Sequence, residues 1–484
     1  MGSENPPLHI FLFPFIAHGH IIPTIDMAKL FADRGVQATI ITTPLNSPII
    51  SKSLQSFNTL IQIKTIEFPC VQVGFPQGFE NMNSIPSPDL IPKFFEATAL
   101  LQEPLEQILQ QSVPDCLIAD MFFPWATDSA AKFGIPAILF HGTGFFSLCA
   151  SECLRLHRPY DHVSSDSETF VIPNLPGEIT MTRSQVPDFL KYNEDTIISR
   201  LLIASKEAEL TSYGVIVNSF YELEKDYADH YRNFLGRKAW HIGPLTLFNT
   251  KIEKKTEVQE HDCLKWLDTK KPKSVVYVCF GSTTSFPEYQ LREIAMGLEA
   301  SGQQFIWIVR KPKKDEHYRE EEQEWLPRGF EKRMEGKGLI IRGWAPQVKI
   351  LENRAIGAFV THCGWNSTLE SMSEGVPMVT WPVFAEQFYN EKLVTEVLKI
   401  GVRVGATKWM RMMGDRDCIN WEAIEKAVNR VMEGEEAEEM RNRAKVLALK
   451  AGKAVEKGGS SYSDLNSLIQ DLSRRRRQLE EIKC

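Results

Sequence analysis

The sequence has little excess charge of either sign and no apolar run that approaches the length of a membrane span. Its 55 Lys and Arg residues stand against 62 Asp and Glu residues, which gives a net charge of −7. A weakly acidic chain argues against a nucleic-acid-binding protein that works through a basic field. Roughly 20 consecutive apolar residues are needed to cross a bilayer. We therefore expect a soluble globular protein with no nucleic-acid partner and no membrane span.

Cysteine pairs and a basic leader are also missing. The nine cysteines are odd in number and include no CxxC pair, which is typical of reduced thiols rather than of a disulfide framework or a zinc site. Residues 1–8 hold no Lys or Arg and so lack the basic start of a signal peptide. We therefore expect a cytoplasmic protein.

What the sequence does contain is an alternation of strands and helices that begins twice. A strand at 9–13, a helix at about 20–34 and a strand at 38–43 form one βαβ unit, and the pattern restarts at a strand over 274–280. Such units build parallel, doubly wound sheets. We predict an α/β protein with Rossmann-like domains at 1–245 and 263–455, a polar linker at 246–262 and a helical segment at 456–484. Further strands are predicted at 116–119, 137–140, 214–217, 304–309, 339–342, 358–361 and 378–380.

The stretch from Trp344 to Gln387 carries the strongest functional signal. A strand runs into His362, and Asn366 and Ser367 open the following helix. The N–H groups and positive dipole end of a helix start bind anions such as phosphate. Taken singly, each residue here is better explained by a structural role, but their position together on successive strand-to-helix turns of one sheet edge favours a ligand site. Trp344 and Trp365 offer flat faces for a base or a sugar. Acceptors for hydroxyl groups are offered by Glu370, Glu386 and Gln387.

The same stretch resembles the signature box of plant secondary-product UDP-glycosyltransferases, a branch of glycosyltransferase family 1. It has the length of that box and its intact HCGWNS core. Two further motifs of the family are present, GHxxP at Gly19–Pro23 and VYVxFGS at Val276–Ser282, so the resemblance covers essentially the whole chain. It implies the GT-B fold, in which two facing Rossmann-like domains bind the acceptor and the UDP-sugar. It also implies that the helix at 456–484 returns to the first domain.

The resemblance implies a role for each matching residue of the box. Uracil would stack on Trp344 while the backbone of Ala345 contacts its edge, and Gln347 and Glu370 would reach the ribose hydroxyls. Many members have Asp at the position of Glu386, so this carboxylate reaches about one methylene further. Some relatives use a threonine near the sugar, for which Thr143 is the nearby candidate. The diphosphate would be held by Ser282, His362, Asn366 and Ser367, and the sugar by Trp365, Glu386 and Gln387.

His20 and Asp120 form a second candidate constellation. The dipole at a helix start favours the neutral imidazole that a general base requires. In the family, the histidine of GHxxP is the base, and the aspartate of a DxxFxxW-like segment orients it. His18 competes for this role, but only His20 has Pro three residues later. The structural alternative for both His20 and Asp120 is a helix cap.

Three other patterns are weak. Asp415-Arg416-Asp417 matches a metal motif but lies in a polar loop without a phosphate cradle, and the pair His18 and His20 lacks a third ligand. Gly142-Thr143-Gly144 lacks the third glycine of a dinucleotide fingerprint. We therefore expect no metal and no resident cofactor. A non-catalytic nucleotide-sugar binder and an NAD-dependent oxidoreductase remain as alternatives.

Together these features predict a monomeric, metal-independent, inverting O-glucosyltransferase with UDP-glucose as co-substrate. The acceptor expected from the resemblance is a small lipophilic metabolite, a flavonoid-type phenol first and a triterpenoid sapogenin second. The run Arg474–Arg477 is predicted to be a solvated helix end rather than a nuclear signal, because Glu480 and Glu481 follow it. Candidate walls of an apolar acceptor pocket, with the core as the alternative, are Phe122, Phe123, Phe145 and Phe146.

Overall fold

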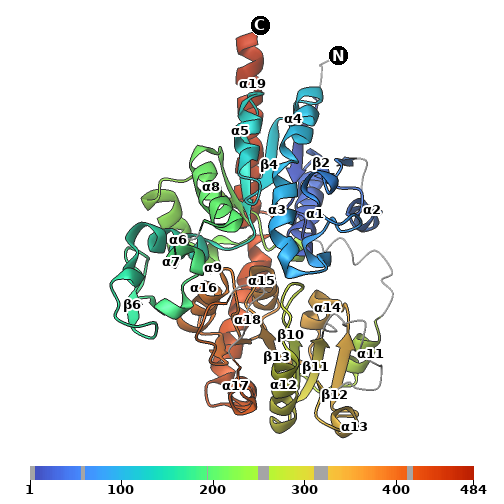
Figure 1. Ribbon diagram of the computed structural model, residues 1–484, viewed down its shortest axis with the longest axis vertical. Helices are drawn as coiled ribbons and strands as arrows, with labels where there is room; N and C mark the ends of the chain where they lie inside the picture. Colours follow the sequence, from blue (N-terminus) through green and yellow to red (C-terminus); the bar gives the residue numbers. More distant parts are fainter. Residues whose placement is uncertain are drawn as a thin grey trace. The chain divides into compact units, whose positions relative to one another are not determined.

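Two parallel sheets form the framework of the protein in the computed structural model (Figure 1). The structure describes residues 6–55, 60–192, 195–248, 261–309, 325–410 and 418–483. The first compact unit comprises residues 1–145, 192–256 and 453–484, and the second comprises residues 146–191 and 257–452. The α/β class with two Rossmann-like sheets, which the sequence predicted, is confirmed.

The first sheet has the strand order β3-β2-β1-β4-β5-β8-β9, and all its neighbours are parallel. Its central strands are apolar and buried on both faces, as parallel strands covered by helices require. Strand β3 is half-exposed at one edge and β9 is three residues long at the other, which explains why neither was predicted from periodicity. The strands are β1 His9–Phe13, β2 Gln37–Thr42, β3 Ile61–Thr65, β4 Cys116–Asp120, β5 Ala137–His141, β8 Gly214–Val217 and β9 Ala239–His241.

The second sheet has the order β12-β11-β10-β13-β14-β15 and is also parallel throughout. Helices α12 and α17 pack closely against each other beside this sheet. Gly297 of α12 allows this approach, because a side chain there would meet Ile424 of α17. The strands are β10 Val275–Cys279, β11 Gln304–Val309, β12 Gly338–Arg342, β13 Ile356–Thr361, β14 Met378–Thr380 and β15 Gly401–Arg403. A separate antiparallel pair consists of β6 Thr169–Val171 and β7 Thr180–Thr182.

Helices connect the strands and cover the sheets. None of those in the described part of the chain is both long and apolar enough to cross a bilayer. In chain order they are α1 His18–Asp33, α2 Ser47–Leu54, α3 Ile91–Ala99, α4 Gln102–Gln111, α5 Trp125–Ala131, α6 Phe145–His157, α7 Asp188–Lys191, α8 Ile197–Thr211, α9 Tyr221–Asp229, α11 Asp262–Asp268, α12 Glu288–Ala300, α13 Phe330–Arg333, α14 Gln347–Glu352, α15 Trp365–Ser373, α16 Gln387–Lys392, α17 Trp421–Glu433, α18 Ala437–Ala454 and α19 Ser460–Lys483.

The last helix, α19, belongs to the first unit although the preceding helices belong to the second. Its residues Leu465, Leu468 and Leu472 are buried in the apolar core of the first unit. Asp464 pairs with Arg232 at 2.7 Å and accepts a hydrogen bond from the backbone N–H of His241 in β9. The three buried leucines and the partly exposed ion pair of Asp464 with Arg232 therefore hold the C-terminal helix on the first sheet.

Two details differ from the sequence prediction. Residues 146–191 group with the second unit, whereas one continuous domain was expected over 1–245. The arginine run is not simply solvated, because Arg476 lies 3.5 Å from Asp115 and Arg475 lies over the ring of Tyr213. The predicted DxD-like sequence and most of the predicted linker lie outside the described residues.

Candidate active site

In the first unit, the strand order reverses between β1 and β4. The chain leaves β1 for β2 and β3 on one side, and β4 and β5 lie on the other. Ligands bind at such a switch point because the loops after the two strands diverge there. His20 lies in the first turn of α1, which follows β1, and Asp120 is the last residue of β4. The fold thus brings two residues a hundred positions apart to one point.

Their side chains make a direct contact. Nδ1 of His20 lies 2.6 Å from Oδ2 of Asp120, and the Asp120 side chain is fully buried while that of His20 is 21% exposed. Oδ1 of Asp120 accepts a hydrogen bond from the backbone N–H of Phe122 at 3.1 Å. An ionised carboxylate only accepts, so Nδ1 carries the proton and Nε2 is the acceptor nitrogen. Both side chains predicted as the catalytic pair therefore meet, in an arrangement suited to a base and its orienting acid.

The surroundings of His20 are apolar on several sides. Its ring makes edge contacts with Phe15 and Phe122, each with centroids 5.5 Å away. Of the four phenylalanines predicted as pocket walls, only Phe122 is half-exposed, whereas Phe123, Phe145 and Phe146 are buried in the core. The wall prediction is wrong for these three, because the loop after β4 turns Phe123 toward Phe13 and the first turn of α6 buries Phe145 and Phe146.

The turn after β5 also reaches His20. A Cβ added to Gly142 would lie 3.4 Å from Cε1 of His20, so the backbone of this turn packs against the imidazole. The next residue, Thr143, has a buried hydroxyl with no hydrogen-bond partner among the described residues. The backbone N–H of the competing residue, His18, donates to Oδ1 of Asn83.

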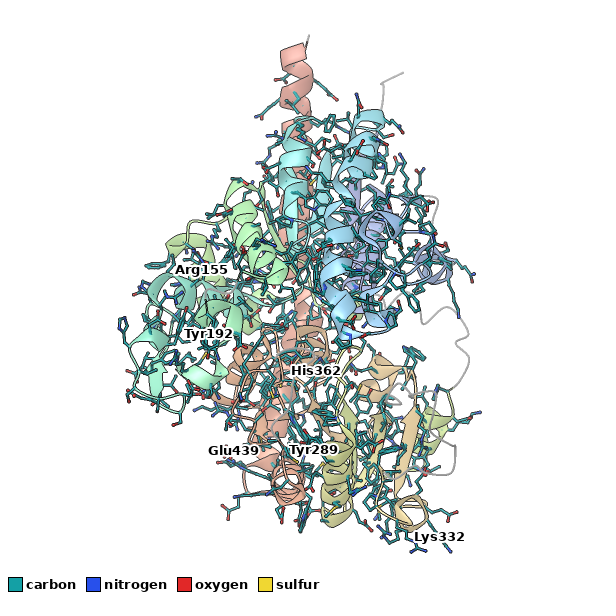
Figure 2. The ribbon with its side chains drawn as sticks, viewed as in Figure 1. Arg155, Tyr192, Tyr289, Lys332, His362 and Glu439 are labelled. Atoms are coloured by element: carbon teal, nitrogen blue, oxygen red, sulfur yellow. The ribbon has the colours of Figure 1, made fainter. Side chains whose placement is uncertain are left out.

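The second unit reverses its strand order between β10 and β13 in the same way. The loop after β10 carries Gly281, the predicted phosphate ligand Ser282 and Thr284. His362 follows β13 directly and lies inside this unit (Figure 2). The hydroxyl of Thr284 is buried without a partner in the described structure, and sequence reasoning did not single it out. An unpaired buried hydroxyl in a predicted phosphate loop is a further candidate ligand group.

His362 occupies a space that two glycines leave open. A Cβ on Gly281, whose φ is +72°, would lie 2.6 Å from Cε1 of His362, and one on Gly364 would lie 2.5 Å from Nε2. Burial lowers the pKa of His362 to about 4, so the ring is neutral at physiological pH. Its Nδ1 is buried with no partner among the described residues. The ring is held by shape rather than by charge, which suits a neutral donor to an anionic ligand.

The start of α15 supplies the predicted helix terminus. Asn366 and Ser367 lie in its first turn, and the backbone N–H of Trp365 lies 3.3 Å from Oε1 of Glu386. The indole of Trp365 is only 2% exposed, so its predicted open face is wrong and only its backbone borders the site. The same Glu386 oxygen accepts from Asn390 at 3.1 Å, which fixes this carboxylate beside the helix start.

A hydrogen-bonded group on α14 and α15 forms another part of the site. Nε2 of Gln347 donates to Glu370 at 2.7 Å and to Ser367 at 3.0 Å, while Oε1 accepts from Tyr277. Burial raises the pKa of Glu370 to about 7, and the Gln347 hydrogen bond opposes that rise. Trp344, which precedes α14, is 76% exposed. This exposure leaves the faces of the indole open for stacking. Ala345 beside it is buried.

Gln387 is buried at the start of α16, and its amide oxygen is already used. Oε1 accepts from the backbone N–H groups of Val383 and Phe384 at 2.9 and 3.0 Å. Ala385 between them has a φ of +52°, a strained value for a residue with a side chain. The two acceptor bonds hold this loop, so the amide nitrogen is the group that Gln387 offers to a ligand. The prediction that its oxygen also accepts from a sugar hydroxyl is therefore wrong.

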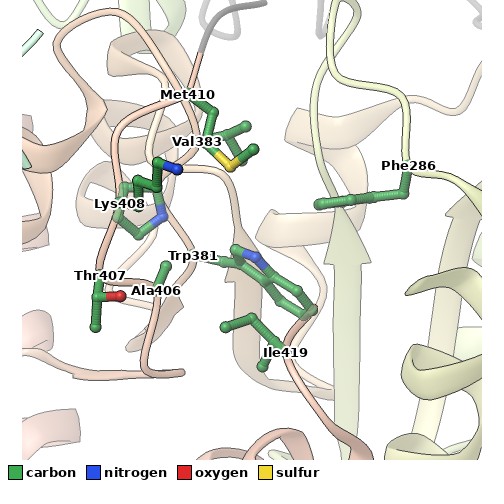
Figure 3. A pocket seen from close by; sticks show the side chains of 9 residues that line it. Phe286, Trp381, Val383, Ala406, Thr407, Lys408, Met410 and Ile419 are labelled. Atoms are coloured by element: carbon green, nitrogen blue, oxygen red, sulfur yellow. The ribbon is translucent and has the colours of Figure 1, made fainter. Parts of the chain in front are cut away.

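Residues 406–410 pack against the same loop and line a small pocket beside it (Figure 3). Nε1 of Trp409 donates to the carbonyl of Ala385 at 2.9 Å, and the backbone N–H of Met410 donates to that of Val383 at 2.8 Å. The pocket walls include Phe286, Trp381, Val383, Met410 and Ile419. These contacts set the position of Glu386 and Gln387 from behind.

Across the described ranges, no group of three or more His, Cys, Asp or Glu side chains is arranged to hold a metal ion. The sequence left two other roles open in this region, a metal pair at His18 and His20 and a helix cap at Asp120. The structure shows instead that the side chains of His20 and Asp120 contact each other. Within that part of the chain the cysteines are free as well.

Comparison with known proteins identifies the family to which the chain is related. The family model described as UDP-glucoronosyl and UDP-glucosyl transferase matches residues 94–441. A scopoletin glucosyltransferase of Nicotiana tabacum is 57% identical over 475 residues, covering 96% of this chain and 98% of the relative. A UDP-glucose flavonoid 3-O-glucosyltransferase 7 of Fragaria ananassa is 57% identical over 479 residues, covering 96% of each.

A solved structure shares the fold throughout. UGT73P12 of Glycyrrhiza uralensis, crystallised with glycyrrhetinic acid 3-O-monoglucuronide, superposes with a TM-score of 0.90 at 40% identity. The similarity covers 99% of this chain and 98% of that one. The GT-B fold predicted from the resemblance is confirmed for the two Rossmann-like domains.

Proposed function

The chain belongs to the UDP-glucoronosyl and UDP-glucosyl transferase family, and we propose that it is an inverting O-glucosyltransferase that moves glucose from UDP-glucose to a hydroxyl group of a lipophilic secondary metabolite. The choice of donor is supported by the relatives named as glucosyltransferases. The protein is proposed to act as a monomer in the cytoplasm.

The observation that carries this proposal is the 2.6 Å contact between Nδ1 of His20 and Asp120. With the Nδ1 proton directed at the carboxylate, Nε2 takes the proton from the acceptor hydroxyl. The buried Asp120 then stabilises the imidazolium that forms and keeps the ring in its tautomer. The activated acceptor oxygen forms a bond to the anomeric carbon, while the bond from that carbon to UDP breaks on the opposite face. The α-linked sugar of the donor thereby becomes β-linked.

The second unit would hold the donor. The helix start at Asn366 and Ser367, together with Ser282 and the neutral ring of His362, faces the diphosphate, and Thr284 adds a hydroxyl. Fixed donors at this place stabilise the charge that grows on the departing UDP. No step is assigned to a metal.

The same unit supplies groups for the uridine and the sugar. The exposed indole of Trp344 stacks on uracil beside the backbone of Ala345, and Gln347 and Glu370 receive the ribose hydroxyls. Glu386 accepts from a sugar hydroxyl, and the Gln387 amide nitrogen donates to one. Trp365 contributes through its backbone.

A phenolic acceptor is proposed ahead of a triterpenoid one. The relatives named for scopoletin and flavonoid substrates are 57% identical to this chain, whereas the protein crystallised with a triterpenoid glucuronide is 40% identical. Phe122 beside His20, the half-exposed one of the candidate wall residues, gives an aromatic face for a planar phenol.

The test is a mass-spectrometric screen of one acceptor panel with UDP-glucose, containing flavonols, coumarins and triterpenoid sapogenins. We expect products heavier by one hexose, with the largest yields among the phenols, and loss of turnover in His20→Ala. Sapogenins as the better acceptors would reverse the acceptor order. Full turnover in His20→Ala would remove the proposed base.

A further inference from the structure

A buried carboxylate outside the proposed catalytic pair lies at the centre of a charged cluster in the first unit. Glu209 lies on α8, and its side chain is fully sealed from solvent. The cluster places Nε2 of His141 at 3.1 Å, Nζ of Lys206 at 3.4 Å and the hydroxyl of Tyr231 at 2.6 Å from its two oxygens. The guanidinium of Arg237 pairs with it as well. None of the steps derived above uses Glu209.

The cluster keeps this carboxylate ionised. Burial alone raises the pKa of Glu209, but Lys206, His141 and Arg237 outweigh burial and hold it well below its ordinary value. A buried charge is tolerated only when it is paired, and removal of one partner leaves the others uncompensated. Glu209 is therefore the negative charge that the surrounding hydrogen-bond donors and cations stabilise.

One of these donors leads to the proposed active site. His141 is the last residue of β5, is 1% exposed, and has no aligned hydrogen bond from either ring nitrogen to a described residue. The contact that the structure gives its ring is the 3.1 Å approach of Nε2 to Oε2 of Glu209. The strand beside β5 is β4, which ends at Asp120.

The turn that follows His141 is the one that packs on the catalytic histidine. Gly142 lies so close to His20 that an added Cβ would be 3.4 Å from Cε1. Only one peptide unit separates this contact from the imidazole held by Glu209. A shift of His141 therefore moves the backbone that borders His20.

We propose that Glu209 is a positioning residue for glucosyl transfer, which anchors His141 at the end of β5 and thereby fixes the turn at residues 142–143 against the ring of His20. This inference rests on the proposed function of His20 as the base. Glu209 touches neither substrate; it acts through the geometry of the proton acceptor.

The test uses Glu209→Gln in the full chain, with kcat and KM measured for an unactivated phenol and for a nitrophenol. Misplacement of a base costs most where proton removal is hardest, so we expect kcat to fall about tenfold with the unactivated phenol and distinctly less with the nitrophenol. KM for UDP-glucose should stay within about twofold, because its residues lie in the second unit. Equal losses with both acceptors would overturn the proposal.

A matched control is Glu106→Gln. The carboxylate of Glu106 on α4 accepts from Ser129, Lys132 and Gln102 at 2.7, 2.8 and 3.0 Å, and these partners belong to α4 and the α5 segment rather than to the turn at residues 142–143. Its removal should leave the acceptor dependence of kcat unchanged. If Glu209→Gln fails to fold, Glu209→Asp keeps the charge while drawing it away from His141, and the same acceptor dependence should appear in weaker form. Its absence in a folded Glu209→Asp would count against the proposal.

A double-mutant cycle with His141→Asn separates this route from a general loss of rigidity. If Glu209 acts through His141, the double variant should lose no more than the more impaired single variant. Losses that multiply would overturn the proposal. A parallel assay of His20→Ala distinguishes the two levels of the account. Full activity there removes the proposed base, whereas an inactive His20→Ala beside a Glu209→Gln that behaves like Glu106→Gln removes only the positioning role.

Discussion

The two sheets present the same switch point with different chemistry. Each reverses its strand order between its first and fourth strands, and each places a histidine beside the point of reversal. In the first unit, His20 contacts the carboxylate of Asp120 at 2.6 Å and is partly exposed. In the second, His362 is buried, Nδ1 has no described partner, and burial lowers its pKa to about 4.

The difference lies in what the neighbouring strand ends with. A carboxylate at the end of β4 allows the first histidine to accept a proton and hold it, because the resulting cation is paired at once. Two glycines around His362 leave room for its ring and supply no charge, so that ring stays neutral. We propose that the switch point serves proton transfer in the first unit, through a histidine after β1, and anion binding in the second, through a histidine after β13.

The largest expected effect comes from His20→Ala. With an unactivated hydroxyl, loss of a general base is expected to lower kcat by roughly 10²–10⁴-fold. Affinity for UDP, measured by calorimetry, should change little, because the residues proposed to bind UDP lie in the second unit. Asp120→Asn should show the same pattern in milder form, since it keeps the ring in place but removes the charge. A larger loss in His18→Ala than in His20→Ala would mean that the base is assigned to the wrong histidine.

The second largest effect is expected from Gly281, the glycine beside His362, and it concerns UDP binding rather than turnover. In Gly281→Ala the new Cβ would lie 2.6 Å from Cε1 of His362, so the ring must move. We expect UDP binding to weaken on the order of 10–100-fold, with the His20–Asp120 pair intact.

Gly35→Ala is the matched control for that experiment. Gly35 has a φ of +74°, close to the +72° of Gly281, but no atom lies within 4 Å of its added Cβ. Both substitutions should cost about 1 kcal/mol of unfolding free energy for the left-handed backbone. Only Gly281→Ala should lose UDP affinity in calorimetry. Equal UDP affinities in the two variants would show that the space around His362 does not matter for the donor.

Gln387→Glu should affect the choice of sugar. A glutamate retains the acceptor oxygen that holds the N–H groups of Val383 and Phe384, but it removes the amide donor. The wild-type protein is expected to prefer UDP-glucose to UDP-galactose by about tenfold or more in kcat/KM, because a mismatched hydroxyl leaves a polar group unpaired. The variant should lose about tenfold with UDP-glucose and most of that preference. Equal wild-type rates with both donors would contradict this assignment.

The smallest effect concerns pH and Glu370. Burial raises the pKa of this carboxyl to about 7, so it is half protonated near neutrality. Ribose hydroxyls donate best to the ionised form, so UDP binding should release protons and strengthen as pH rises from 6 to 8. We expect a several-fold change in the UDP dissociation constant across this range by calorimetry. In Glu370→Gln the part of the change due to this group should vanish, which separates it from titration of UDP itself.

The sequence predicted the bounds of several strands and the two residues, His20 and Asp120, whose side chains meet in the first unit. Apolar β-branched runs define β1, β10 and β14 within one residue of their observed bounds, because buried parallel strands carry little other pattern. Edge strands β3 and β15 escaped prediction because they are short or half-exposed. Family membership also sets aside the oxidoreductase alternative.

What the sequence could not predict depends on side-chain direction. Trp365 turns into the core at the first position of α15, and the oxygen of Gln387 caps its own loop. Both depend on how a turn is rotated, which periodicity does not record. Glu209 is invisible for a similar reason, since a glutamate on an amphipathic helix gives no sign that charged partners from other elements surround it.

The measurement that tests the contrast between the two histidines most directly is a series of phenols of increasing pKa, assayed with His20→Ala and His362→Ala at saturating UDP-glucose. Proton removal from a phenol of pKa near 10 needs a base, whereas one of pKa near 7 is largely ionised already in mildly alkaline buffer. The account predicts that the loss in kcat grows with phenol pKa for His20→Ala and is the same at every pKa for His362→Ala. Parallel dependences in the two variants would contradict it.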